Sequence, residues 1–200
     1  MKGVAATLER CARARDLAFT SRDEQSWVGK LILSFTMACM TGVAAQVRIP
    51  LGFTDVPLTG QTFAVLLAGM LLGGGWGAAS QVIYIALGAA GLPWFQGMGG
   101  GIGVLGGPTS GYLMGFVPAA MLAGWAAGRY RESGRRLPLL AALVSATVLI
   151  LACGSIYLAW GLGRGLGIAV VQGFVPFLMG DVLKAAAAAS IAIKLLPRKP

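Results

Sequence analysis

Residues 137–160 read LPLLAALVSATVLILACGSIYLAW, a run without a charged side chain. Apolar residues follow one another here without the alternation that is typical of a half-buried strand. As an α-helix, a run of this length extends about 36 Å, enough to cross the roughly 30 Å hydrocarbon core of a membrane. Because lipid offers the backbone no hydrogen-bonding partners, the chain must satisfy them itself, as a helix does. The stretch therefore predicts a transmembrane helix.

The composition of the whole chain points the same way. Of its 200 residues, 56% are hydrophobic and 12% are charged, and 31 are glycine, which is enriched in membrane helices. A soluble domain carries about twice that charged fraction. We predict a charged cytoplasmic N-terminal tail (1–28) and a single all-α membrane domain (29–197), a bundle of six transmembrane helices. The expected spans are residues 27–47, 58–72, 76–92, 109–129, 137–160 and 174–196.

The distribution of Lys and Arg predicts the orientation of these spans. Basic residues gather in the N-terminal tail, in the loop 129–136 and at the C-terminal end, whereas Arg48 and Arg164 are isolated. Because cytoplasmic loops are rich in Lys and Arg, we expect both termini in the cytoplasm. The Gly/Pro-rich loops 48–57, 92–108 and 161–173 then lie outside. Irregular backbone is tolerated there when it lines or closes a cavity, so the ligand pocket is expected at the extracytoplasmic side.

Only Asp181 and Lys184 are charged residues clearly inside a predicted span. Each costs roughly 2.5–3.5 kcal/mol at the centre of a membrane helix. A spacing of three residues puts them on one helix face, and such residues usually face the bundle interior and mark a solute site. The alternative is a structural ion pair that only fastens the last helix.

Other polar and aromatic side chains are predicted at the same side of the membrane. The aromatic ones could instead be anchors in the headgroup belt. As a group they are typical of the walls of a small, partly apolar pocket. The candidate substrate-binding residues are Thr59, Gln61, Trp94, Phe95, Gln96, Tyr112, Asp181 and Lys184.

Several kinds of chemistry are excluded or disfavoured. The chain has no histidine, and its three cysteines are widely spaced, so we expect no metal site, no cofactor and no catalytic residues. The segment GIGVLG (101–106) matches a dinucleotide-binding pattern, but it follows a membrane helix and lacks the acidic residue about 20 positions on. An intramembrane enzyme using Asp181 remains a disfavoured alternative, as does a purely structural membrane subunit.

The first predicted span carries small residues at a spacing of four, namely Ser34, Ala38 and Gly42. Such a face lets another helix approach closely. Packing within this chain and docking of a separate protein are both open.

Four segments in this order resemble the BioY family, the substrate-binding (S) components of energy-coupling-factor (ECF) vitamin transporters. They are VPLTGQTF (56–63), YIALGAAGLPWF (84–95), GGPTSGY (106–112) and PFLMGDVLK (176–184). The resemblance covers about residues 30–196. Trp94 departs from the family pattern, which more often has Val there.

The resemblance implies uptake of biotin by a multi-pass protein of the bacterial cytoplasmic membrane. It also implies partners, namely a transmembrane coupling protein and two ATP-binding subunits, with Ser34, Ala38 and Gly42 as the docking face. The chain has no Walker A sequence of its own, so ATP hydrolysis is expected from those subunits and not from this chain. The alternative within this class is an S component for another small vitamin, such as thiamine or riboflavin.

Overall fold

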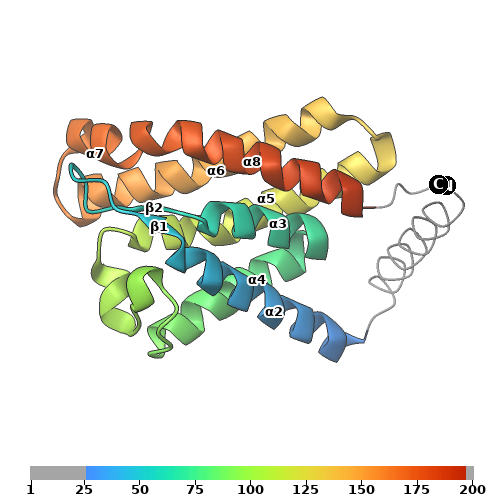
Figure 1. Ribbon diagram of the computed structural model, residues 1–200, viewed down its shortest axis with the longest axis horizontal. Coiled ribbons are helices and arrows are strands. Elements are labelled where there is room, and N and C mark those ends of the chain that lie inside the picture. The colour runs from blue at the N-terminus through green and yellow to red at the C-terminus, as the bar shows by residue number, and fades with distance from the viewer. Residues whose placement is uncertain (1–25, 197–200) are drawn as a thin grey trace, which may run out of the picture.

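The computed structural model describes residues 26–196, which fold into a bundle of seven α-helices with one small hairpin (Figure 1). The predicted tail 1–28 therefore lies almost wholly outside the described residues. The helices are α2 (Trp27–Gln46), α3 (Gln61–Leu72), α4 (Gly74–Ala89), α5 (Ser110–Ser133), α6 (Arg136–Ile156), α7 (Leu166–Gly173) and α8 (Val175–Leu195).

Helix length separates the predicted spans into two groups. By length and composition, four of the described helices can cross a membrane: α2, α5, α6 with its continuation to Gly161, and α8. Helix α3 has 12 residues and α4 has 16, so they extend only about 18 and 24 Å. The all-α membrane class is thus confirmed. Of the six predicted spans, four correspond to described helices that are long and apolar enough to cross a membrane.

The loops hold more structure than the sequence suggested. Strands β1 (Arg48–Ile49) and β2 (Leu58–Thr59) pair antiparallel, so the helix expected from residue 58 begins at Gln61. The 92–108 loop contains short 3-10 segments, η1 (Gln96–Met98) and η2 (Ile102–Gly106). The 161–173 segment was predicted as a glycine-rich connector, but its apolar second half forms α7 after a π-helical turn, η3 (Tyr157–Gly161).

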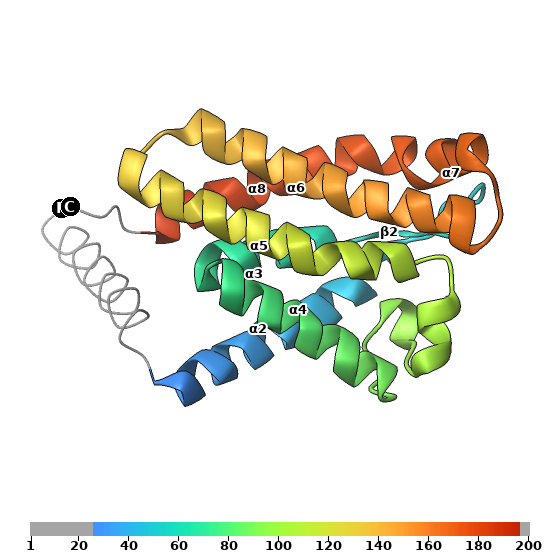
Figure 2. The ribbon, with the colours of Figure 1, turned by 180° about the vertical axis from the view of Figure 1, so that it is seen from behind.

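Helix α5 lies at the centre of the bundle and packs against α6, α3 and α4 (Figure 2). Small residues make the close approach possible. Gly124 of α5 lies against the turn between α3 and α4, where a Cβ atom would overlap the backbone of Gly74. This explains part of the high glycine content, since glycine lets membrane helices pack at short distance.

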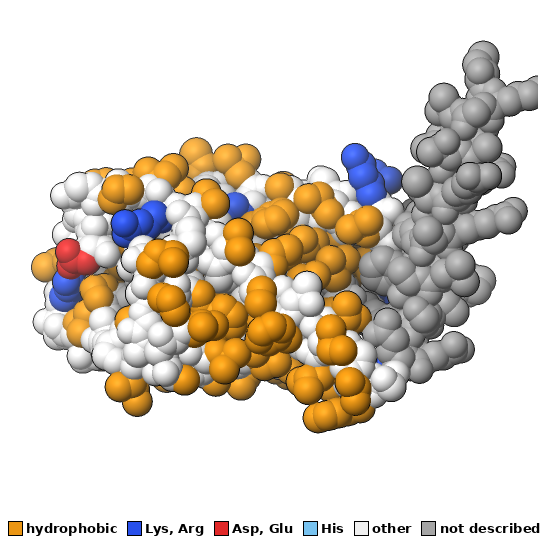
Figure 3. All heavy atoms as spheres, turned by 60° about the horizontal axis from the view of Figure 1, so that its bottom comes forward, with side chains coloured by type: hydrophobic (Ala, Val, Ile, Leu, Met, Phe, Trp, Pro, Cys, Tyr) orange, Lys and Arg blue, Asp and Glu red, His pale blue; other side chains and the backbone are white. Residues whose placement is uncertain are grey.

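The outer surface of the bundle is apolar. Large hydrophobic side chains on six of the seven described helices are more than half exposed, among them Val43, Met114, Trp125 and Met179. One face of the molecule shows apolar side chains across its middle (Figure 3). Lipid tails cover such a surface in place of water, in agreement with a membrane location.

The two ends of the bundle differ in character. The start of α2, the α5–α6 turn and the end of α8 lie at one end, and the β1–β2 hairpin and α7 lie at the other (Figures 1 and 2). The three irregular loops that were expected on one side of the membrane therefore gather at one end of the fold.

Candidate functional site

A cavity lies between α3, α5, α6 and α8, below the hairpin and the η1 segment. Seven of the eight candidate substrate-binding residues line it: Thr59, Gln61, Phe95, Gln96, Tyr112, Asp181 and Lys184. The remaining wall is mostly apolar and is formed by Val56, Pro57, Thr62, Thr109, Leu113, Phe116, Ile150, Leu151 and Phe177.

The charged centre of the cavity is an ion pair within α8. Lys184 Nζ donates to Asp181 Oδ1 over 2.7 Å, and the side chains are 19% and 4% exposed. The two residues thus share one helix face, as the sequence predicted. An ion pair this deep in a membrane protein is stabilised only by good geometry and further partners, and the side chain of Thr62 is such a partner for Asp181.

Gln61 is held in place at the start of α3 by two neighbours. Its Oε1 accepts from the hydroxyl of Thr59 over 3.0 Å, and its Nε2 donates to the hydroxyl of Tyr84 over 2.8 Å. A carboxamide has two N–H donors and two acceptor lone pairs, so one of each is left over. Gln61 lines the cavity and therefore keeps one donor and one acceptor for a further partner.

Two aromatic walls depend on glycines of neighbouring helices. The ring of Phe95 lies against Gly88 of α4, where a Cβ atom would overlap it. The ring of Tyr112 lies in the same way against Gly154 of α6, and its hydroxyl donates to Gly173 O over 2.6 Å. Larger residues at either glycine would push the ring out of place.

Trp94 lies outside the cavity, behind Phe95. Its Nε1 donates to Tyr84 O over 2.9 Å, and its ring packs against Tyr84 and over Gly42 of α2. The side chain is 9% exposed. The residue is thus neither a wall of the cavity nor an exposed headgroup anchor, and it joins the η1 region to α2 and α4.

Gln46, at the C-terminal end of α2, holds the η1 region in place. Its Nε2 donates to Trp94 O and Phe95 O over 3.2 and 3.0 Å, and its Oε1 accepts from the backbone N–H of Met98 over 3.0 Å. Met98 has a positive φ of 60°. One side chain therefore fixes the backbone that carries Phe95 and Gln96.

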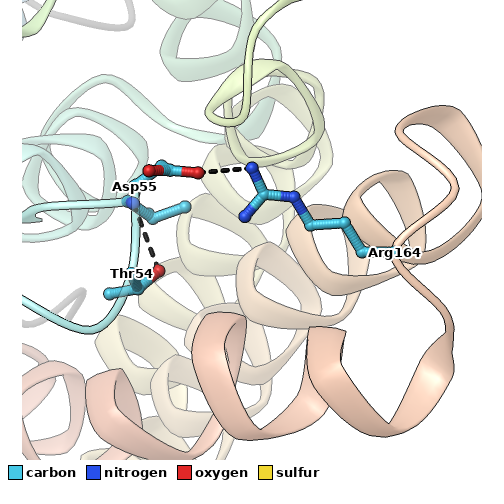
Figure 4. Close-up of polar contacts among 4 residues, drawn as sticks. Thr54, Asp55 and Arg164 are labelled. Atoms are coloured by element: carbon cyan, nitrogen blue, oxygen red, sulfur yellow. Dashed lines mark hydrogen bonds and ion pairs between the residues drawn. The ribbon is translucent and has the colours of Figure 1, made fainter.

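The hairpin that covers the cavity is tied to the α6–α7 connection. Arg164 donates to the carboxylate of Asp55, and Thr54 Oγ1 accepts from the backbone N–H of Val56 over 3.2 Å (Figure 4). Asp55 directly precedes Val56 and Pro57, which line the cavity. This ion pair is largely solvent-exposed.

The small-residue face of α2 is internal. Ser34, Ala38 and Gly42 are all buried, Ser34 Oγ donates to Trp76 O over 3.1 Å, and Gly42 lies against Trp94. In this structure the three residues form a helix contact within the chain and do not present an exposed docking face. Of the two open interpretations, this placement matches packing within the chain.

Several cavity residues were missed by sequence reasoning. Phe177 precedes Asp181 by one helical turn, and Phe116 follows Tyr112 by one turn, so a spacing of four could have found both. Ile150 and Leu151 of α6 gave no such signal, because the sequence does not distinguish them from the apolar residues around them. Gln46 and Tyr84 do not line the cavity but hold residues that do. This role is visible only in the folded structure.

The arrangement suits binding of a small, mixed polar and apolar molecule. It offers a carboxylate, an ammonium group, two carboxamides and aromatic walls. Among the described residues, no group of three or more His, Cys, Asp or Glu side chains is placed to hold a metal ion.

Residues 14–200 match the model of the BioY family. A Methanothermobacter thermautotrophicus protein described as a probable biotin transporter is 39% identical, over 67% of this chain and 90% of its own length. A Thermotoga maritima protein described as a biotin transporter is 38% identical, over 83% of this chain and 95% of its own.

Among solved structures, the S component for biotin from an ECF-type ABC transporter superposes with a TM-score of 0.77 at 26% identity. The superposition covers 84% of this chain and 90% of that one. The similarity therefore extends over the whole bundle.

Proposed function

The chain belongs to the BioY family, and from this membership we propose that it takes up biotin as the S component of an ECF-type transporter. The observation that carries the proposal is the cavity around Asp181 and Lys184, built in the fold of a biotin S component. The function is transport and not catalysis.

Biotin matches the polar groups of the cavity. Its ureido ring has two N–H donors and a carbonyl acceptor, and its tail is a carboxylate. We propose that Asp181 accepts from the ureido N–H groups, and that Lys184 balances this charge or meets the ligand carboxylate. Gln61, Thr59 and Gln96 supply the neutral hydrogen bonds, since Gln61 keeps one donor and one acceptor free.

The apolar rings and chain of biotin require the aromatic part of the wall. Phe95, Tyr112 and Phe177 line the cavity, with the rings of Tyr112 and Phe177 6.3 Å apart. Trp94 acts indirectly in this proposal, by supporting the backbone of Phe95.

The orientation predicted from the charges supports a pocket open to the outside. We propose six membrane-embedded helices, with α3 and α4 as short ones, both termini in the cytoplasm, and location in the cytoplasmic membrane. The gathering of the start of α2, the α5–α6 turn and the end of α8 at one end supports this topology.

Transport through an ECF-type system requires partners. We propose a transmembrane coupling protein and two ATP-binding subunits, which supply the ATP hydrolysis. The buried state of Ser34, Ala38 and Gly42 means that docking there requires α2 to move away from α4. An exposed surface of the bundle is the simpler contact.

A competition assay tests the ligand. Purified protein is loaded with labelled biotin and challenged with unlabelled biotin, thiamine or riboflavin. Displacement by biotin alone supports the proposal, and preferential displacement by thiamine or riboflavin would assign the S component to that vitamin.

A further inference from the structure

A second cavity lies at the opposite end of α5. Trp125 and Arg129 of α5 line it, together with Glu132, Arg135 and Leu139 at the turn into α6. Arg129 follows Tyr112 by 17 positions, so the two cavities are about 25 Å apart along the helix.

The charge at this cavity is positive, and its two arginines are not held in ion pairs with other described residues. In the described part of the chain, the ion pairs are Arg164 with Asp55 and Lys184 with Asp181. Neither Arg129 nor Arg135 has a carboxylate partner there, and both are exposed. Glu132 offsets one of the two charges, so the site favours an anion of low charge.

The cavity also has an apolar side. The guanidinium of Arg129 lies 5.9 Å from the centre of the Trp125 ring, and Trp125 is 61% exposed. Tryptophan favours the boundary between lipid and water, where an aromatic ring can hold a cation at its face. Pro138, at the start of α6, is exposed and continues the apolar wall.

The position of the cavity is fixed by the two helices that form it. Helices α5 and α6 are both candidate spans, and only Gly134 and Arg135 separate them. A turn this short must lie at the membrane surface. Helix α6 also begins without a side-chain cap, so no capping side chain occupies the N–H groups of Arg136 and Leu137 in its first turn.

We propose that this cavity binds the headgroup of an anionic phospholipid. The phosphate lies between Arg129 and Arg135, and the glycerol and acyl chains run along Trp125 and Pro138. A basic pocket between membrane helices at the surface is suited to such headgroups. The site is independent of the ligand bound in the first cavity.

Native mass spectrometry of the full chain in a neutral detergent tests the site. The protein is titrated with phosphatidylglycerol and with phosphatidylcholine of the same acyl chains. We expect tighter binding of phosphatidylglycerol, and a loss of about fivefold in its affinity for each arginine removed in Arg129→Ala/Arg135→Ala. Thermal unfolding of both proteins checks that the variant is folded.

A charge-matched control removes two arginines from the other end, in Arg48→Ala/Arg164→Ala. Retained preference for phosphatidylglycerol in this control supports the site. An equal loss of affinity in both double variants would show that binding depends on net charge alone and would overturn the proposal. Trp125→Ala keeps every charge and should also weaken binding, because it removes the apolar wall. No preference for phosphatidylglycerol in the unmodified protein would overturn the proposal.

A further arm distinguishes a lipid from a soluble anion. Inorganic phosphate is added at the concentration of the bound lipid. Retention of phosphatidylglycerol supports a lipid site, whereas displacement at equal concentration would identify a simple phosphate site and overturn the assignment.

Discussion

The ammonium group of Lys184 lies 2.7 Å from the carboxylate of Asp181, one turn apart on the face of α8 that lines the cavity. Both charges sit among apolar walls. Either side chain can meet a ligand only from a position that the other one fixes, so the pair acts as a unit.

Removing one member of the pair should therefore cost both stability and affinity. Truncating one partner of a buried ion pair leaves an uncompensated charge, at about 3–5 kcal/mol for a fully buried pair. Asp181→Asn and Lys184→Ala should each weaken biotin binding at least tenfold, measured by titration calorimetry. Unchanged affinity in both would remove the pair from the binding site.

The double variant Asp181→Asn/Lys184→Met separates the two effects. It leaves no unpaired charge, so thermal stability should return towards that of the unmodified protein. Biotin binding should stay weak, because the groups that contact the ligand are gone. If the double variant bound biotin as tightly as the unmodified protein, the pair would have only a structural role.

Gly88 is the second place where a small change should disturb the site. A methyl group there overlaps the ring of Phe95. Gly88→Ala should weaken biotin binding several-fold. Gly75→Ala is the matched control in the same helix, because a Cβ atom at Gly75 meets nothing within 4 Å. Equal affinities for the two variants would show that the Phe95 ring does not contact biotin.

Gln46 gives a test of positioning at a distance from the ligand. Gln46→Ala removes three hydrogen bonds to the η1 region and should lower biotin affinity mainly by increasing the dissociation rate. Thr36→Ala, which removes an exposed hydroxyl bonded only within α2, serves as control. Dissociation of labelled biotin at the same rate from both variants would contradict this role.

The ion pair between Asp55 and Arg164 should contribute little to stability. Exposed pairs are worth about 0.2–1 kcal/mol, and these side chains are 60% and 33% exposed. Asp55→Asn should lower the midpoint of thermal unfolding by only a few degrees, and less so at high salt. A large shift in the midpoint that persists at high salt would show that the hairpin depends on this contact.

Much of the site followed from the sequence, because polar groups in membrane spans are expensive and therefore informative. Asp181 and Lys184 were predicted on one face and are paired there. Thr59, Gln61, Phe95, Gln96 and Tyr112 were assigned to the same side and line the same cavity. These predictions required only helix geometry and the distribution of charge.

Other features depended on how helices meet, which no local pattern encodes. The position of Trp94 behind Phe95 follows from the gap above Gly42. Helix α7 was missed because its glycines suggested a loop, while its apolar residues formed a helix against α6 and α8. The short lengths of α3 and α4 were set by the hairpin and the turn at Gly73.

The central claim is tested most directly by the mass of the protein itself. The full chain is purified from cells grown with ample biotin and measured by native mass spectrometry, beside Asp181→Asn. We predict that the unmodified protein carries the mass of one biotin and that the variant carries much less. An unmodified protein without bound biotin, which also fails to take it up when biotin is added, would contradict the account.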